Sequence, residues 1–286
     1  MIFYIERLYA YIQIIRPLNV VFGVLSVFIT FDLLDIEFNF IFLMYPSLNV
    51  ALFIAAANVT NDIFDFPTDK INRPRRPIPS GNIRLPYAVF YAFTLYTVGI
   101  ILTFYINSFS RMIALVIVLP LLVLYTPVFK KIPLMGNMII GLVLGSVFIF
   151  SEAAFTDSLG KMWIPFLLAF GLTFIRELVK DMEDVEGDTA AGISTYPMKF
   201  GLVKSFYILI ALSTFLCAGA LIPYFLSIYG YRYFLVLITG VEIPLLASIF
   251  YLSRGVTPKR CGNIASVIKL ITLMGMLTIW TIGKTS

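Results

Sequence analysis

The same acidic spacing, D-x-x-D-x-x-x-D, occurs twice in the 286-residue chain, each time at the end of a long apolar segment. The first copy is Asp62, Asp65 and Asp69, and the second is Asp181, Asp184 and Asp188. On a continuous helix these offsets place three carboxylates on one face, over about 10 Å of axis. Carboxylates this close repel one another and need a cation among them. Two Mg²⁺ ions, one in each motif and together holding a diphosphate, would meet that need, so we predict that catalysis is located at Asp62, Asp65, Asp181 and Asp184.

A basic, proline-rich segment, KINRPRRPIPSG (residues 70–81), follows the first motif. Its prolines fix the backbone and would hold guanidinium groups in a defined arrangement, which is what recognition of a phosphate requires. An ordinary basic loop at the membrane surface is the alternative. The predicted diphosphate-binding residues are Lys70, Arg73, Arg75 and Arg76, with Lys130 and Lys180 from outside the segment.

Other polar residues near the ends of apolar segments are weaker candidates. Arg16, Asn19 and Tyr125 could contact a lipid headgroup, although an asparagine at such a position often makes only a hydrogen bond between helices. Glu242 and Lys269 are charges inside apolar segments, where a charged group is functional by default. A mutual structural salt bridge is the alternative for this last pair.

The elements that must position these residues are membrane helices. Sixty per cent of the residues are apolar and 13% are charged, which is typical of an integral membrane protein. Nine windows are long enough to cross a bilayer: about 17–34, 42–62, 86–106, 111–129, 134–151, 162–182, 202–222, 232–252 and 263–283. We therefore predict an all-α bundle of nine transmembrane helices around a central cavity, with cytoplasmic cap loops over 63–85 and 183–201.

Almost no sequence remains outside these windows, so we expect one domain, residues 1–286. The repeated motif is consistent with an internal repeat of about 17–129 and 134–252 followed by a last span, 263–283, or with convergence alone. Pro67 is expected to interrupt the first motif and leave Asp69 in a loop, and Gly187 to break the second motif. Residues 1–16 are expected to form an amphipathic surface helix.

Charge placement predicts the orientation in the cell membrane. With a cytoplasmic N-terminus and nine spans, fifteen Lys and Arg residues fall on the cytoplasmic side and four, Arg111, Lys161, Arg232 and Lys284, on the other. This bias favours a cytoplasmic N-terminus, an external C-terminus and both acidic motifs on the cytoplasmic face. The basic excess indicates a membrane surface and anionic substrates, and nothing indicates nucleic acid.

Several chemistries are excluded by composition. The chain has no histidine, and its two cysteines form no motif, which argues against zinc sites, haem ligation by histidine and histidine-based acid–base catalysis. An allylic diphosphate needs none of these groups. Metals and arginines stabilise the departing diphosphate, an apolar chamber protects the carbocation, and a second, lipidic substrate supplies the nucleophile.

The segment NDIFDFPTDKINRPRRPIPSG resembles the first signature of the UbiA superfamily of intramembrane prenyltransferases, and RELVKDMEDVEGDTAAGISTYPMKFG resembles the second. Their separation and the nine-span layout also agree, so the resemblance covers essentially the whole chain. It implies Mg²⁺-dependent transfer from an isoprenyl diphosphate donor to a lipid acceptor. The implied metal ligands are Asn61, Asp62, Asp65 and Asp69, facing Asp181, Asp184 and Asp188.

Within the superfamily, the I-N-R-P-x-R-P-I-P-S-G and K-D-x-E-D-x-E-G-D stretches are most similar to the ether-lipid branch. Members of that branch transfer a geranylgeranyl group to the glycerol hydroxyl of geranylgeranylglyceryl phosphate. Chlorophyll synthases share a similar RPIPSG run, so the second motif, with Lys180 and Glu183, carries this assignment. Pro74 stands where quinone-type members more often have threonine, a departure that disfavours an aromatic acceptor.

Three alternatives remain at this point. An aromatic prenyltransferase of quinone, tocopherol or chlorophyll type would use the same fold. A CDP-alcohol phosphotransferase would require a D-G-x-x-A-R continuation, whereas Asp65 is followed by FPT and Asp184 by VEG. A cation transporter would place its carboxylates near the bilayer midplane, whereas both motifs here lie at the ends of spans.

Overall fold

The computed structural model describes residues 2–191 and 194–284, and within these residues every regular element is a helix. Seven helices or helix series are long and apolar enough to cross a membrane, which makes the chain a multi-pass membrane protein, as its sequence predicts. They are α3 (Phe40–Phe64), α5 (Leu85–Leu102) with η1 (Thr103–Tyr105), α6 (Ser108–Met112) with η2 (Ile113–Val118) and α7 (Leu119–Tyr125), α8 (Met135–Thr156), α12 (Leu202–Phe225), α13 (Tyr231–Leu237) with η4 (Ile238–Glu242) and α14 (Ile243–Ser253), and α15 (Pro258–Trp280).

The two other predicted spans are also helical. The helix α2 (Pro17–Leu33) is short for a span, and it bends by 47° from the N-terminal helix α1 (Ile2–Ile14). The helix α9 (Trp163–Glu183) has 21 residues, but its last two turns carry the charges of the second motif. Each of the nine predicted windows thus coincides with a helix or a helix series, while the number that crosses the bilayer stays a prediction.

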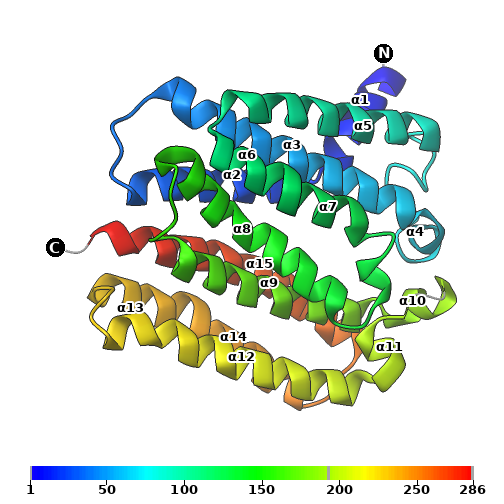
Figure 1. Ribbon diagram of the computed structural model, residues 1–286. Helices are drawn as coiled ribbons and strands as arrows, with labels where there is room; N and C mark the ends of the chain where they lie inside the picture. The colour runs from blue at the N-terminus through cyan, green and yellow to red at the C-terminus, as the bar shows by residue number, and fades with distance from the viewer. Residues whose placement is uncertain (1, 192–193, 285–286) are drawn as a thin grey trace.

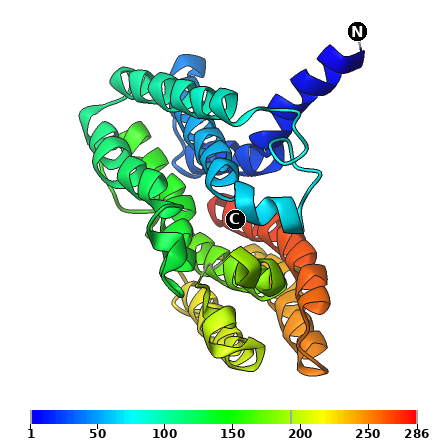
Figure 2. The ribbon, with the colours of Figure 1, turned by 90° about the vertical axis from the view of Figure 1, so that its right-hand side faces the viewer.

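The helices lie roughly side by side, and the two acidic motifs meet at one end of the bundle, at the right of Figure 1. We call this the motif end. In Figure 2 the chain runs around the bundle from blue through green and yellow to red, so that α15 returns to contact α2. The indole N–H of Trp280 donates to Asp32 at 2.8 Å and links these first and last long helices at the opposite end.

Both motifs have the same local structure, which differs from the one predicted. The helix α3 ends at Phe64, Asp65 follows, and a seven-residue helix α4 (Phe66–Asn72) carries Asp69. Likewise α9 ends at Glu183, Asp184 follows, and α10 (Val185–Ala191) carries Asp188. The N–H of Asp69 donates to the carbonyl of Asp65 at 2.8 Å, and that of Asp188 to the carbonyl of Asp184 at 3.0 Å.

The expected positions of the helix breaks were therefore wrong. Asp69 lies in a helix and not in a loop, because Pro67 occupies the first turn of α4, where no intrahelical N–H is needed. Gly187 lies inside α10, and the break falls three residues earlier, at Asp184. The expected cap loops are thus partly helical: α4 belongs to the first, and α10 and α11 (Tyr196–Phe200) to the second, of which residues 192 and 193 lie outside the described part.

Small residues allow α8 and α9 to approach closely. A Cβ at Gly141 would lie 3.0 Å from the carbonyl oxygen of Phe170, and one at Gly145 would lie 2.9 Å from that of Phe166. Glycines four residues apart are a common basis for tight helix contacts in membranes. Nearer the motif end, Asn137 in the first turn of α8 donates to Asp181 of the second motif at 2.8 Å.

A buried carboxylate holds the opposite end of the same helix pair. Glu152 of α8 is 3% exposed and accepts hydrogen bonds from the backbone N–H groups of Gly160 (3.0 Å), Lys161 (2.7 Å) and Met162 (3.1 Å), which directly precede α9. Three donors directed at one carboxylate form an anion site that this side chain fills itself.

We expect Glu152→Ala to destabilise the protein by about 3 kcal/mol, because it leaves these N–H groups without their charged acceptor. The midpoint of thermal unfolding in detergent should fall by roughly 5–10 °C. Glu37→Ala is the matched control, since Glu37 is an exposed acidic residue in a neighbouring loop. Equal midpoints for the two variants would contradict a structural role of Glu152.

Candidate active site

A long chamber opens among the two acidic motifs and continues deep into the bundle. Its polar mouth contains both motifs and several basic side chains, and its far part is lined by apolar residues such as Phe148, Met276 and Ile279. On α9 alone the lining extends from Leu168 to Asp181, which corresponds to about 20 Å of helix. The chamber therefore offers a charged entrance and an apolar interior to one elongated ligand.

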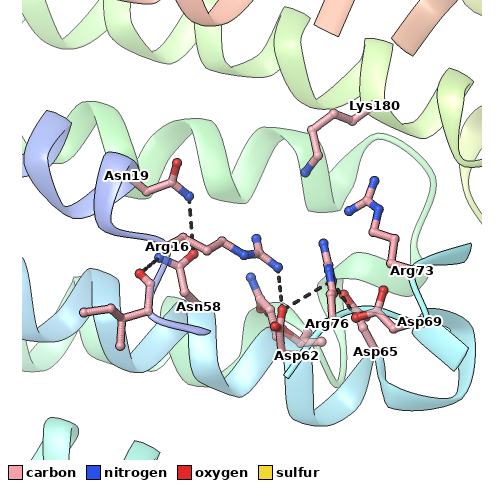
Figure 3. Close-up of polar contacts among 12 residues, drawn as sticks. Arg16, Asn19, Asn58, Asp62, Asp65, Asp69, Arg73, Arg76 and Lys180 are labelled. Atoms are coloured by element: carbon pink, nitrogen blue, oxygen red, sulfur yellow. Dashed lines mark hydrogen bonds and ion pairs between the residues drawn. The ribbon is translucent and has the colours of Figure 1, made fainter. Parts of the chain in front are cut away.

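Basic side chains pair with the carboxylates of the first motif (Figure 3). The amine of Lys130 contacts both carboxylate oxygens of Asp65 at 2.6 Å. Arg76 donates to Asp69 at 2.5 Å and to Asp62 at 3.3 Å, and Arg16 donates to Asp62 at 2.5 Å. These contacts neutralise three carboxylates that would otherwise repel one another.

Arg16 reaches Asp62 from a strained corner of the chain. It connects α1 to α2 with φ 52° and ψ 73°, a left-handed conformation that is uncommon for residues other than glycine. The amide of Asn58 donates to the carbonyl of Ile15 at 2.9 Å and stabilises this corner from α3. Asn19 lies beside it and its amide nitrogen is 3.5 Å from the side-chain oxygen of Asn58.

The second motif faces the first across the mouth. Arg73, from the segment after α4, donates to both carboxylate oxygens of Asp184 at 2.9 and 3.0 Å. Asp181 accepts a hydrogen bond from the amide of Asn137 at 2.8 Å. Arg73 thus links residues that are 111 positions apart in sequence, and it brings the two motifs to one site, as their spacing predicts.

One turn deeper on α9, Glu177 is buried and pairs with two cations. Arg176 donates to it, and the amine of Lys180 lies 3.0 Å from its other oxygen. Lys180 extends into the chamber from the wall opposite Asp62 and Asp65 (Figure 3). The two walls therefore carry separate groups of cations.

Burial disfavours the charged form of the third carboxylate in each motif. Burial raises the pKa of Asp69, although Arg76 opposes this change. Burial and the neighbouring charge of Asp184 raise the pKa of Asp188 to about 6. A carboxylate whose pKa is raised in this way is stabilised in its charged form by any added cation.

The donor set fits a hard divalent cation. The chamber lining includes Asn61, Asp65, Asp69, Asp181, Asp184 and Asp188, all of which present oxygen ligands of the kind that Mg²⁺ prefers. Within residues 2–191 and 194–284, no three acidic or thiol side chains lie close enough together to hold a metal ion. The basic partners described above occupy the carboxylates in this conformation, so a bound metal would take the place of lysine and arginine.

Most of the predicted site residues line the chamber, and three do not. Asp62 is 3% exposed, is engaged by two arginines and is absent from the lining. Lys70 is exposed, with its amine 4.3 Å from the centre of the Phe66 ring, and Arg75 is also exposed. The structure therefore does not bring Lys70 and Arg75 to the phosphate-binding end of the chamber.

Three supporting residues were not among the predicted site residues. Asn137 holds Asp181, Thr126 donates a hydrogen bond to Asn61, and Glu177 holds Arg176 and Lys180. Asn137 and Glu177 are polar residues within otherwise apolar spans, a pattern that indicates a functional role. Thr126 follows the predicted headgroup contact Tyr125, which does line the chamber.

Glu242 and Lys269 do not pair, so the structural salt bridge considered for them is absent. Glu242 is 6% exposed in the π-helical segment η4, and its Oε1 has no hydrogen-bond partner within the described residues. Lys269 lies on α15 and lines the chamber. The described residues provide neither a hydrogen bond nor an ion pair for its amine.

Comparison with known proteins agrees with this geometry. The family model described as "UbiA prenyltransferase family" matches residues 21–271. A digeranylgeranylglyceryl phosphate synthase of Methanosarcina mazei is 35% identical over 229 residues, which cover 80% of this chain and 78% of that protein. The synthase of Methanobrevibacter smithii is 34% identical over 275 residues, covering 93% and 95%.

Two solved structures have similar folds. A digeranylgeranylglyceryl phosphate synthase superposes with a TM-score of 0.74 at 31% identity, covering 97% of this chain and 99% of that one. A homologue from Archaeoglobus fulgidus, solved with DMAPP and Mg²⁺ bound, superposes with a TM-score of 0.69 at 18% identity, covering 94% and 98%. The second comparison concerns the fold alone.

Proposed function

The chain belongs to the UbiA prenyltransferase family, and from this premise we propose its substrates and the residues that act on them. The enzyme is a prenyltransferase that moves a geranylgeranyl group from geranylgeranyl diphosphate to the glycerol hydroxyl of geranylgeranylglyceryl phosphate. The bond between the first prenyl carbon and the diphosphate oxygen breaks, an ether bond forms, and the hydroxyl proton is released. The product carries the second ether bond of an archaeal-type lipid.

One observation carries this proposal: two acidic motifs and their basic partners surround the mouth of a single deep apolar chamber. The apolar interior suits the prenyl chain and excludes water, which would otherwise capture the carbocation. The charged mouth suits the diphosphate. Relatives named digeranylgeranylglyceryl phosphate synthase, at 34–35% identity over most of the chain, support the same acceptor.

The proposed metal ligands are Asn61, Asp62, Asp65, Asp69, Asp181, Asp184 and Asp188, with two Mg²⁺ as the expected number. When bound, Mg²⁺ would supply charge that stabilises the departing diphosphate. Arg73, Arg76 and Lys130, which now pair with carboxylates, would bind the same group. Asp62 remains a proposed catalytic residue and metal ligand, and in this conformation it pairs with Arg16 and Arg76.

We further propose nine membrane crossings in the cell membrane, with a cytoplasmic N-terminus and an external C-terminus. The excess of basic residues at the motif end supports this orientation. The matched breaks at Asp65 and Asp184, each followed by a seven-residue helix, support an internal repeat. In this arrangement α4, α10 and α11 cover the cytoplasmic entrance of the chamber.

Product analysis tests the proposed function. Purified protein with Mg²⁺ and geranylgeranyl diphosphate should convert geranylgeranylglyceryl phosphate into a product that is one geranylgeranyl unit heavier, which mass spectrometry detects. Hydroxybenzoate-like aromatic acceptors should give no product under the same conditions. Prenylation of the aromatic acceptors in preference to the glycerol phosphate would replace this proposal with the quinone-type alternative.

A further inference from the structure

The wall formed by α9 and α15 contains cations that the donor diphosphate does not account for. Arg176 and Lys269 both line the chamber, and neither contacts a carboxylate of the two acidic motifs. Lys269 has no ion pair or hydrogen bond within the described residues. A lysine inside a membrane protein is costly unless it meets an anion or water, so this residue is suited to an anion that comes with a ligand.

Lys269 and Arg176 lie at the same depth. A Cβ at Gly262 would lie 2.7 Å from Glu183, and one at Gly275 would lie 3.4 Å from Leu172, so α15 runs antiparallel along α9. On α15, Lys269 lies seven residues beyond Gly262. Because the two helices are antiparallel, Lys269 is level with the position on α9 about six residues before Glu183. That position is Glu177, the neighbour of Arg176. The two cations thus face one level of the chamber from neighbouring helices.

We propose that Arg176 and Lys269, supported by Lys180, form a separate subsite for the phosphate of the lipid acceptor. This inference rests on the proposed function, because it assumes an acceptor that carries a phosphomonoester. Glu177 pairs with Arg176 and Lys180 and holds both toward the chamber. The three cations and one carboxylate leave a local charge of about +2, which matches the charge of about −1.5 to −2 on a phosphomonoester at neutral pH.

The depth of the subsite suits the reaction. The acceptor hydroxyl must reach the first prenyl carbon, which lies on the apolar side of the diphosphate. The acceptor phosphate, only a few bonds from that hydroxyl, can then bind on the same apolar side, deeper than the diphosphate. Arg176 is five residues, or about 7 Å of helix, deeper than Asp181 of the second motif.

The test compares Lys269→Met and Arg176→Gln with the wild type by steady-state kinetics. Each variant should raise KM for geranylgeranylglyceryl phosphate by about 10- to 100-fold, the loss expected for one hydrogen bond to a charged group. KM for geranylgeranyl diphosphate should not change. Lys269→Arg should restore most of the acceptor affinity, because it keeps the charge.

Two controls separate a phosphate subsite from a structural effect. Lys259→Met makes the same substitution at an exposed position of α15 that does not line the chamber, and its KM values should equal those of the wild type. The dephosphorylated acceptor alcohol should have a similar KM with the wild type and with Lys269→Met, because it lacks the group that the lysine binds.

The outcomes distinguish this subsite from the proposed function. If the wild type prenylates only acceptors without a phosphate, the proposed function itself fails. If the wild type prefers the phosphorylated acceptor but both variants retain its KM, the proposed function stands and the subsite is wrong. A rise in KM for geranylgeranyl diphosphate instead would assign Lys269 to the donor and would also overturn the subsite.

Discussion

Activity should disappear when divalent cations are removed with EDTA and should return on addition of Mg²⁺ or Mn²⁺. The chamber mouth offers only hard oxygen ligands from the two motifs, which hold such ions well. Without added cations, Lys130, Arg73 and Arg76 remain paired with carboxylates and are not available to the diphosphate. Formation of the prenylated product measured by mass spectrometry is the readout, and full turnover in EDTA would contradict metal dependence.

Asp65→Asn and Asp184→Asn should each lower kcat by at least about a hundredfold, the scale of removing one charged group from a preorganised site. These residues occupy equivalent helix breaks in the two motifs and lie on opposite walls of the mouth. Replacing either carboxylate removes a proposed metal ligand and leaves Lys130 or Arg73 without its anion.

Asp157→Asn is the matched control for these two variants. It makes the same chemical change beyond the end of α8, outside the chamber, and asparagine tolerates the positive φ of 53° at this position. Its activity should equal that of the wild type. Wild-type activity in purified, folded Asp65→Asn or Asp184→Asn would refute the proposed two-motif site.

The arrangement of the site was predictable because it depends on periodicity and spacing. The two motifs end long apolar segments separated by an even number of predicted spans, so a helical bundle must bring them to one face. The distinction among the basic residues of 70–81 was not predictable. Arg73 and Arg76 face the carboxylates while Arg75 faces outward, and this difference arises from the turns after α4, which sequence composition does not specify.

The helix breaks were misplaced for a related reason. Proline and glycine are strong signals of a helix break, and Pro67 and Gly187 were each expected to lie at the break itself. The chain instead breaks at Asp65 and Asp184, and the short helices that follow accommodate Pro67 and Gly187. Tertiary contacts determine the positions of the breaks, because α4 packs against α10 across the mouth and the two short helices stabilise each other.

The pairing of acidic and basic side chains at the mouth also has a thermodynamic consequence. The carboxylates and the cations of the site are one another's counter-ions, so each charged ligand that binds must separate an existing ion pair. An isolated anion must separate Lys130 or Arg76 from aspartate, and an isolated metal ion must displace the same cations. A metal ion and a diphosphate that arrive together satisfy both sets of groups at once. Their binding free energies are therefore coupled, and each ligand must increase the affinity for the other by the same factor.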